Sequence, residues 1–130
     1  MDWYALRGKK LSVDLLRERI ELLRSAMETG ERILRNGSGS QFSQDKISSS
    51  VAKLDDLEHT LVEEISELEL ETRIAERTIG ALPETEQMIM RLRYIYAYSW
   101  EQVGAALTYS TSHCKNVHSN ILKKIKDSTQ

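Results

Sequence analysis

The run of apolar residues between Ile47 and Leu82 constrains the fold of this chain more than any other feature. Apolar side chains recur there in alternating steps of four and three residues, which places them on one face of an α-helix. The run covers roughly five heptads, a helix of about 57 Å at 1.5 Å per residue. The pattern therefore predicts one long helix that begins near Gln44 or Asp45. The apolar members are Ile47, Val51, Leu54, Leu61, Ile65, Leu68, Ala75, Ile79 and Leu82.

A second apolar stripe precedes this run and has the same spacing. The segment "RNGSGSQFS" separates the two stripes, and its Gly and Ser content is typical of a loop, here near residues 36–44. Two long helices joined by a short loop should fold back as an antiparallel hairpin over residues 13–82. Residues 1–12 are then a separate N-terminal segment, and whether its Trp3 and Tyr4 dock on the hairpin is left open. The members of this first stripe are Val13, Leu16, Ile20, Leu23, Met27 and Leu34, with Gly30 in the gap.

The hairpin leaves open whether a partner chain binds to it. The second helix should be the longer one, so part of its stripe would lack a partner within the chain. Glu58 and Thr72 interrupt the stripe, and polar residues at such positions weaken a simple coiled coil or select its register and oligomeric state. One interpretation is a scaffold within a single chain, and the other is a homodimer that pairs through residues 13–82.

The only proline, Pro83, begins a region with a different sequence pattern, residues 83–126, which is followed by a tail at 127–130. A proline and early glutamates are ordinary signals for a helix start, so a helix is expected from Glu84 to Ile95. Its apolar face is expected to hold Met88, Ile89, Leu92 and Ile95. No strand pattern occurs anywhere, which predicts an all-α protein.

The next two predicted helices lie on either side of a tight turn. Ser99 and Gln102 have the spacing of a capping box, which predicts a short helix that ends near Leu107. Thr108 and Tyr109 turn the chain, and Ser110 caps a final helix that runs to about Lys126. This order of helix, turn and helix is the layout of a DNA-binding helix-turn-helix.

The final helix has two distinct faces. The inner face should be core, and it holds Cys114, Val117, His118, Ile121 and Ile125. Short polar side chains and a lysine point the other way, namely Ser112, Asn116, Ser119, Asn120 and Lys123. Such a face suits base edges and phosphates, although an ordinary solvated face has the same composition.

The segments "LPETEQMIMRLRY" and "SWEQVGAALTYSTSHCKNVHSNILKKI" resemble region 4 of bacterial sigma factors. The preceding heptad helix, the "YS" before the last helix and His118 within it are similar to small sigma-like regulators of phages and prophages of Gram-positive bacteria. The resemblance implies a transcription regulator, such as an activator of late or packaging genes. It also implies double-stranded DNA and host RNA polymerase as partners, in the cytoplasm of the bacterial host.

The same resemblance assigns roles to positions in the last helix. It implies that Thr111, Ser112, Lys115 and Asn116 face the major groove, where Asn116 could bind an adenine through two hydrogen bonds. His113, Lys115, Ser119, Lys123 and Lys124 are expected near phosphates. Sigma factors commonly carry charged, Arg-rich side chains at the groove positions, and this chain has mostly short neutral ones.

The charge of the chain is unevenly distributed. Residues 1–82 hold 12 Lys and Arg against 16 Asp and Glu, whereas residues 83–130 hold six against four. The formal net charge of −2 is unusual for a nucleic-acid-binding protein. A single mildly basic domain makes few phosphate contacts, so useful affinity would need a dimer or help from polymerase.

Several classes of site find no support in the sequence. Cys114 is the only cysteine, so no internal disulfide can form, and Cys114 with His118 does not supply the four ligands of a structural zinc site. We expect no metal and no cofactor. No nucleophile motif, phosphate loop or carboxylate pair indicates an enzyme, and neither a signal peptide nor a membrane span is predicted.

Other interpretations remain open. Arg91 and Arg93 could approach phosphates or be solvated helix charges, and Trp100 is expected to pack against Met88 or Leu92. At the level of function, one alternative is an oligomeric phage packaging component similar to a small terminase subunit. The other is a module that binds RNA polymerase without contacting bases.

Overall fold

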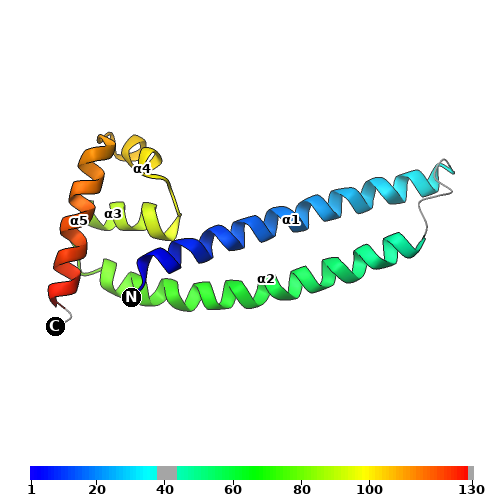
Figure 1. Ribbon diagram of the computed structural model, residues 1–130, viewed down its shortest axis with the longest axis horizontal. Helices are drawn as coiled ribbons and strands as arrows, with labels where there is room; N and C mark the ends of the chain where they lie inside the picture. The colour runs from blue at the N-terminus through cyan, green and yellow to red at the C-terminus, as the bar shows by residue number, and fades with distance from the viewer. Residues whose placement is uncertain (38–43, 129–130) are drawn as a thin grey trace. The chain divides into compact units, whose positions relative to one another are not determined.

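A computed structural model describes residues 1–37 and 44–128, and within these residues all regular structure is helical, as the sequence predicts (Figure 1). The helices are α1 (Trp3–Arg35), α2 (Gln44–Ile79), α3 (Glu84–Met90), the π-helix η1 (Arg91–Ile95), α4 (Trp100–Leu107) and α5 (Thr111–Ser128). Most of the predicted loop lies outside the described residues. The chain packs as two compact units, one formed by residues 12–66 and one by residues 1–11 together with 67–130.

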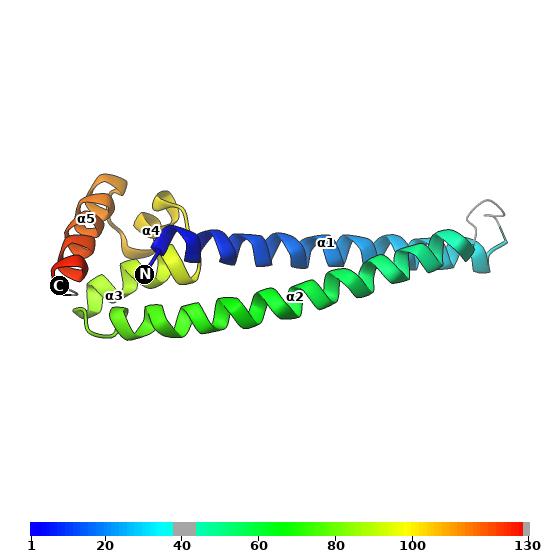
Figure 2. The same cartoon turned by 60° about the horizontal axis from the view of Figure 1, so that its bottom comes forward.

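The unit of residues 12–66 is an antiparallel helix pair, in which α1 and α2 lie side by side in both views (Figures 1 and 2). Val13, Leu16 and Ile20 are buried there, as the spacing predicts. Glu58, a polar residue within the apolar stripe of α2, accepts a hydrogen bond from the guanidinium of Arg24 on α1. An ion pair within the chain therefore accounts for one polar position of the stripe.

The first helix begins at Trp3, so the predicted start at residue 13 is wrong. The stripe continues upstream through Leu6 and Trp3, both of which are buried. Because of this early start α1 has 33 residues and α2 has 36, and the two helices are nearly equal in length. The predicted surplus of unpaired stripe on the second helix is therefore nearly absent.

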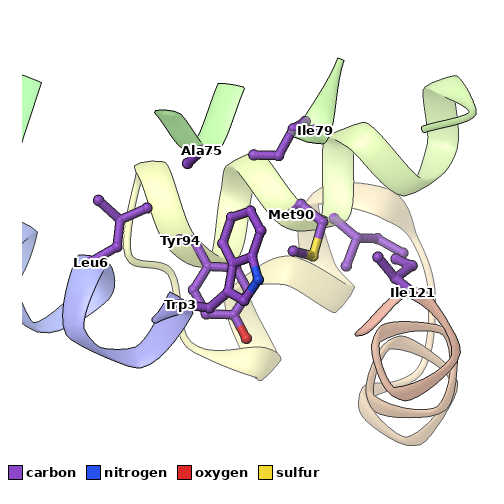
Figure 3. Packing of buried hydrophobic residues seen from close by; sticks show 8 residues of the cluster. Trp3, Leu6, Ala75, Ile79, Met90, Tyr94 and Ile121 are labelled. Carbon is purple, nitrogen blue, oxygen red and sulfur yellow. The ribbon is translucent and has the colours of Figure 1, made fainter. Parts of the chain in front are cut away.

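The other unit contains the C-terminal helices, and its core includes the first turns of α1. Trp3 and Leu6 contribute from α1, Ala75 and Ile79 from the end of α2, and Tyr94 lies among them (Figure 3). The ring centroids of Trp3 and Tyr94 are 5.3 Å apart. The remaining buried members of this cluster are Ile89, Met90 and Ile121. The C-terminal core is therefore built from both ends of the chain.

The helix predicted from Glu84 to Ile95 occupies that span but changes type at Arg91. Its last five residues form a π-helix, closed by a hydrogen bond of 3.0 Å from the Tyr96 N–H to the Arg91 carbonyl. A π-turn holds more residues than an α-turn, which rotates the following side chains relative to an α-helical continuation. Tyr94 and Met90 are fully buried, whereas Met88, predicted on the apolar face, is 47% exposed.

Candidate nucleic-acid interface

The helix that precedes the turn begins with the predicted capping box. The Ser99 hydroxyl accepts a hydrogen bond of 3.1 Å from the Gln102 backbone N–H, and the Gln102 side chain accepts one of 2.8 Å from the Ser99 N–H. These two bonds satisfy donors that a helix start otherwise leaves unpaired. They fix where α4 begins and therefore the direction in which the chain enters the turn.

The turn between α4 and α5 depends on the close approach of Gly104 to Tyr109. The Tyr109 N–H donates to the Gly104 carbonyl at 2.9 Å, and a Cβ atom on Gly104 would lie 2.6 Å from the Tyr109 oxygen. Thr108 adopts a left-handed conformation with φ of 58°. The Ser110 hydroxyl then accepts from the His113 N–H at 3.1 Å, which confirms Ser110 as the cap of α5.

The inner face of α5 is anchored in the core as predicted. Cys114, His118 and Ile121 are buried, and Val117 and Ile125 are half-buried. Burial raises the pKa of the Cys114 thiol, so the thiol remains protonated and behaves as an apolar group.

His118 is held by a hydrogen bond with the Tyr94 hydroxyl. Burial lowers the pKa of His118 below its usual value, and the nearby charge of Arg93 lowers it further. Burial raises the pKa of Tyr94 to about 12. The hydroxyl therefore donates, and a neutral His118 accepts through Nε2.

Trp100 is half-buried and packs against His118 and the core cluster of this unit. Its ring meets the ring of His118 edge-on with centroids 4.7 Å apart. The guanidinium carbon of Arg93 lies over the Trp100 ring, 4.5 Å from its centroid. Arg93 and Tyr94, which contact Trp100 and His118 respectively, both lie in the π-helix η1.

The outer face of α5 carries the predicted DNA contacts. Thr111, at the start of the helix, is half-buried, and the other seven predicted residues are exposed, namely Ser112, His113, Lys115, Asn116, Ser119, Lys123 and Lys124. The His113 ring packs edge-on against Tyr109 with centroids 4.9 Å apart. The structure thus brings all eight residues onto one helix whose opposite face is core.

Lys124 differs from the other lysines of this face because it already has an acidic partner. Its Nζ lies 2.6 Å from a carboxylate oxygen of Glu86 on α3, and the Glu86 side chain is only 16% exposed. This pair has no local signal in the sequence, since the two residues are 38 positions apart. Lys124 would have to leave Glu86 in order to bind a phosphate.

The two arginines of η1 differ in their surroundings. Arg91 donates three hydrogen bonds to the carboxylate of Glu76, at 3.0, 3.1 and 2.8 Å, and these raise its pKa. Arg93 turns inward and donates to the Tyr98 carbonyl at 3.0 Å. Arg91 is therefore a structural link to α2, and Arg93 is a partly buried cation beside the helix-turn-helix.

The N-terminus contributes to this domain, although the predicted boundaries place residues 1–12 in a separate segment. Trp3 packs on Tyr94, and the Arg7 guanidinium donates to the Ala97 carbonyl at 3.3 Å. The signal was present in the sequence, because Trp3 and Leu6 extend the stripe of Val13 upstream at helical spacing.

Within the described residues, no group of three or more His, Cys, Asp or Glu side chains is arranged to hold a metal ion. No helix in the same part of the chain is long and apolar enough to span a membrane.

Residues 78–127 match the family model described as "Sigma-70, region 4". The match begins in the last turn of α2 and extends through α3, η1, α4 and nearly all of α5. No curated protein and no solved structure matches the chain significantly. The described residues are thus all-helical, and their C-terminal part is similar to sigma-70 region 4, a DNA-binding helix-turn-helix domain.

Proposed function

We propose that this protein is a transcription regulator encoded by a phage or prophage, and that it activates late or packaging genes by binding double-stranded DNA. One observation carries the DNA-binding part of the proposal. The helix α5 has a buried face and an exposed polar face, within a domain that matches sigma-70 region 4. The resemblance of most of the chain to small sigma-like phage regulators supports the phage role.

In this proposal the N-terminal half of α5 enters the major groove. Thr111, Ser112, Lys115 and Asn116 lie on the first two turns of the helix, where a recognition helix contacts base edges. An Asn amide matches the hydrogen-bonding edge of adenine, with one donor and one acceptor, and such a pair discriminates by about 1–3 kcal/mol. Asn116 is therefore the residue expected to specify a base.

The remaining cations and hydroxyls of the helix position the protein on the backbone. His113, Ser119, Lys123 and Lys124 are the proposed phosphate contacts, and Lys124 exchanges Glu86 for a phosphate oxygen on binding. Each neutralised phosphate lowers the slope of log affinity against log salt by about 0.9. With so few cations on a chain of net charge −2, a single domain should bind weakly and show only a shallow dependence of affinity on salt.

We propose a homodimer through residues 13–82 as the source of the missing affinity. The surface of the unit of residues 12–66 supports this, because among its described residues four large apolar side chains are exposed, namely Leu15, Leu22, Val51 and Val62. Two linked domains on adjacent half-sites bind with an effective concentration that far exceeds that of free protein. Host RNA polymerase at the same promoter is the other proposed partner.

Light scattering tests the assembly. We expect the wild type to have the mass of a dimer. We expect a Leu15→Glu, Leu22→Glu double variant to have the mass of a monomer. A ring of many subunits would instead favour a packaging component of the small-terminase kind.

Mobility shift tests the DNA-binding function. Purified full-length protein is titrated onto fragments that tile the late and packaging genes of its own phage, at two salt concentrations and with unrelated competitor DNA. We expect one fragment to be shifted in the presence of competitor. If every fragment is released by competitor, the protein does not recognise sequence, and a polymerase pull-down becomes the decisive experiment.

A further inference from the structure

Two arginines from opposite ends of the sequence converge at the entrance to the helix-turn-helix. Arg7 of α1 donates to the Ala97 carbonyl at 3.3 Å, and Arg93 of η1 donates to the Tyr98 carbonyl at 3.0 Å. These carbonyls belong to adjacent residues in the short segment that leads into α4. The two guanidiniums are therefore held at one place by the backbone itself.

The two arginines carry like charge, and neither forms an ion pair with a carboxylate in the described part of the chain. The Nε atoms of Arg7 and Arg93 are both buried without a hydrogen-bond acceptor. Burial is the main cause that lowers the pKa of Arg93, and the charge of Arg7 lowers it further. Glu101 acts in the opposite direction, but it is exposed and does not pair with either arginine. The site thus holds two cations without a counterion.

We propose that Arg7 and Arg93 together bind a phosphate of the DNA backbone beside the start of α4. The inference rests on the proposed DNA-binding function. In a helix-turn-helix the first helix crosses the backbone while the second occupies the groove, so the start of α4 is where a phosphate is expected. The first N–H groups of α4 and its positive end favour an anion at the same place.

The chemistry of the pair suits a phosphate. A guanidinium has five N–H donors in a planar fork that matches two phosphate oxygens. Each of the two arginines donates one hydrogen bond to the backbone, so donors remain on both. Arg93 is also stacked on Trp100, which orders its side chain before the ligand arrives and reduces the entropy lost on binding.

The test measures affinity of the full-length protein for a fluorescent duplex as a function of salt concentration. The variants are Arg7→Gln, which removes the charge and keeps an amide that can donate to Ala97, and Arg7→Lys, which keeps the charge. The matched control is Arg17→Gln, an exposed arginine on the same helix in the unit of residues 12–66. Thermal unfolding of each variant establishes that it is folded.

Arg7→Gln is expected to weaken binding to specific and unrelated duplexes alike and to reduce the salt slope by about 0.9, the value for one phosphate. Arg7→Lys should largely restore the slope, and Arg17→Gln should match the wild type. A wild type that binds DNA while Arg7→Gln retains its full slope would overturn the phosphate site alone. If Arg7→Gln retains its full salt slope on DNA but loses binding to polymerase, the two arginines bind an acidic protein surface and not a phosphate. A wild type that binds no duplex would overturn the proposed function and this site together.

Discussion

The Tyr94 hydroxyl and the His118 imidazole meet inside the core that supports the recognition helix. Each group satisfies the hydrogen-bonding requirement of the other, since the buried hydroxyl donates to the neutral ring. A buried polar atom that loses its only partner costs about 1–3 kcal/mol. The orientation of α5 therefore depends on one polar contact inside an otherwise apolar cluster.

Tyr94→Phe is expected to lower the free energy of unfolding by about 1–3 kcal/mol, because it leaves Nε2 of His118 buried without a donor. Urea denaturation measures the effect. Tyr96→Phe removes the same hydroxyl from a ring that is exposed, and it should change stability by less than about 0.5 kcal/mol. Equal effects of the two substitutions would contradict the structural role of the pair.

Stability should also fall as the pH is lowered below 6.5. Burial holds the pKa of folded His118 below its ordinary value of 6.5, so the unfolded chain binds a proton more readily than the folded chain. This stabilisation is complete above pH 6.5 and is lost as the pH falls toward the folded pKa, by at most about 1.4 kcal/mol per pH unit. Unfolding curves between pH 7.5 and 5.5 measure it.

The control for this pH dependence is the other histidine of α5. His118→Gln should flatten the profile between pH 7.5 and 5.5, whereas His113→Gln, which removes an exposed ring from the same helix, should keep the wild-type slope. A His118→Gln protein with an unchanged slope would show that other groups cause the pH dependence.

At the scale of the elements, Gly104 sets the angle between α4 and α5. A Cβ atom there would lie 2.6 Å from the Tyr109 carbonyl oxygen, so Gly104→Ala should destabilise the protein by about 1–3 kcal/mol and weaken DNA binding. Gly8→Ala is the matched control, because Gly8 is also helical and no atom lies within 4 Å of its added Cβ. That substitution should stabilise by about 0.5–1 kcal/mol. If both substitutions stabilise in thermal unfolding, the turn does not require glycine.

The elements also show which features a sequence can predict. The Ser99 capping box and the Ser110 cap depend on residues three apart, and both were predictable from local spacing. The inner face of α5 was predictable for the same reason, because helical periodicity decides it.

Features that depend on distant partners were not predictable in this way. The pairing of Lys124 with Glu86 joins residues 38 positions apart, and the contact of Arg93 with Trp100 depends on a π-turn that has no clear local signal. Docking of Trp3 was left open by the sequence, because Trp3 and Leu6 continue the stripe but no local signal shows which core receives them.

At the scale of the whole molecule, the C-terminal domain needs the N-terminus of the chain. Trp3 is 7% exposed against Tyr94, and Leu6 is fully buried in the same cluster. The region predicted as an independent domain, residues 83–126, therefore lacks part of its core when taken alone. We propose that the functional DNA-binding unit comprises residues 1–11 and 67–128.

Trp3→Ala is expected to lower the free energy of unfolding by about 3–5 kcal/mol, the cost of removing a buried aromatic side chain. Tyr4→Ala is the neighbouring control. Tyr4 is 67% exposed and touches Tyr94 only edge-on, at 6.4 Å between centroids, so its loss should cost about 0.5–1.5 kcal/mol. Denaturant titration distinguishes the two, and similar costs would argue against N-terminal docking.

The central claim is that the exposed N-terminal half of α5 recognises DNA sequence, and equilibrium binding of Asn116→Ala tests it most directly. Affinities of the wild type, Asn116→Ala and the exposed control Asn120→Ala are measured on the fragment found by tiling and on an unrelated duplex. Asn116→Ala should lose about 1–3 kcal/mol of preference for the specific fragment, while Asn120→Ala keeps it. The same preference in all three proteins, or no preference in the wild type, would contradict the claim.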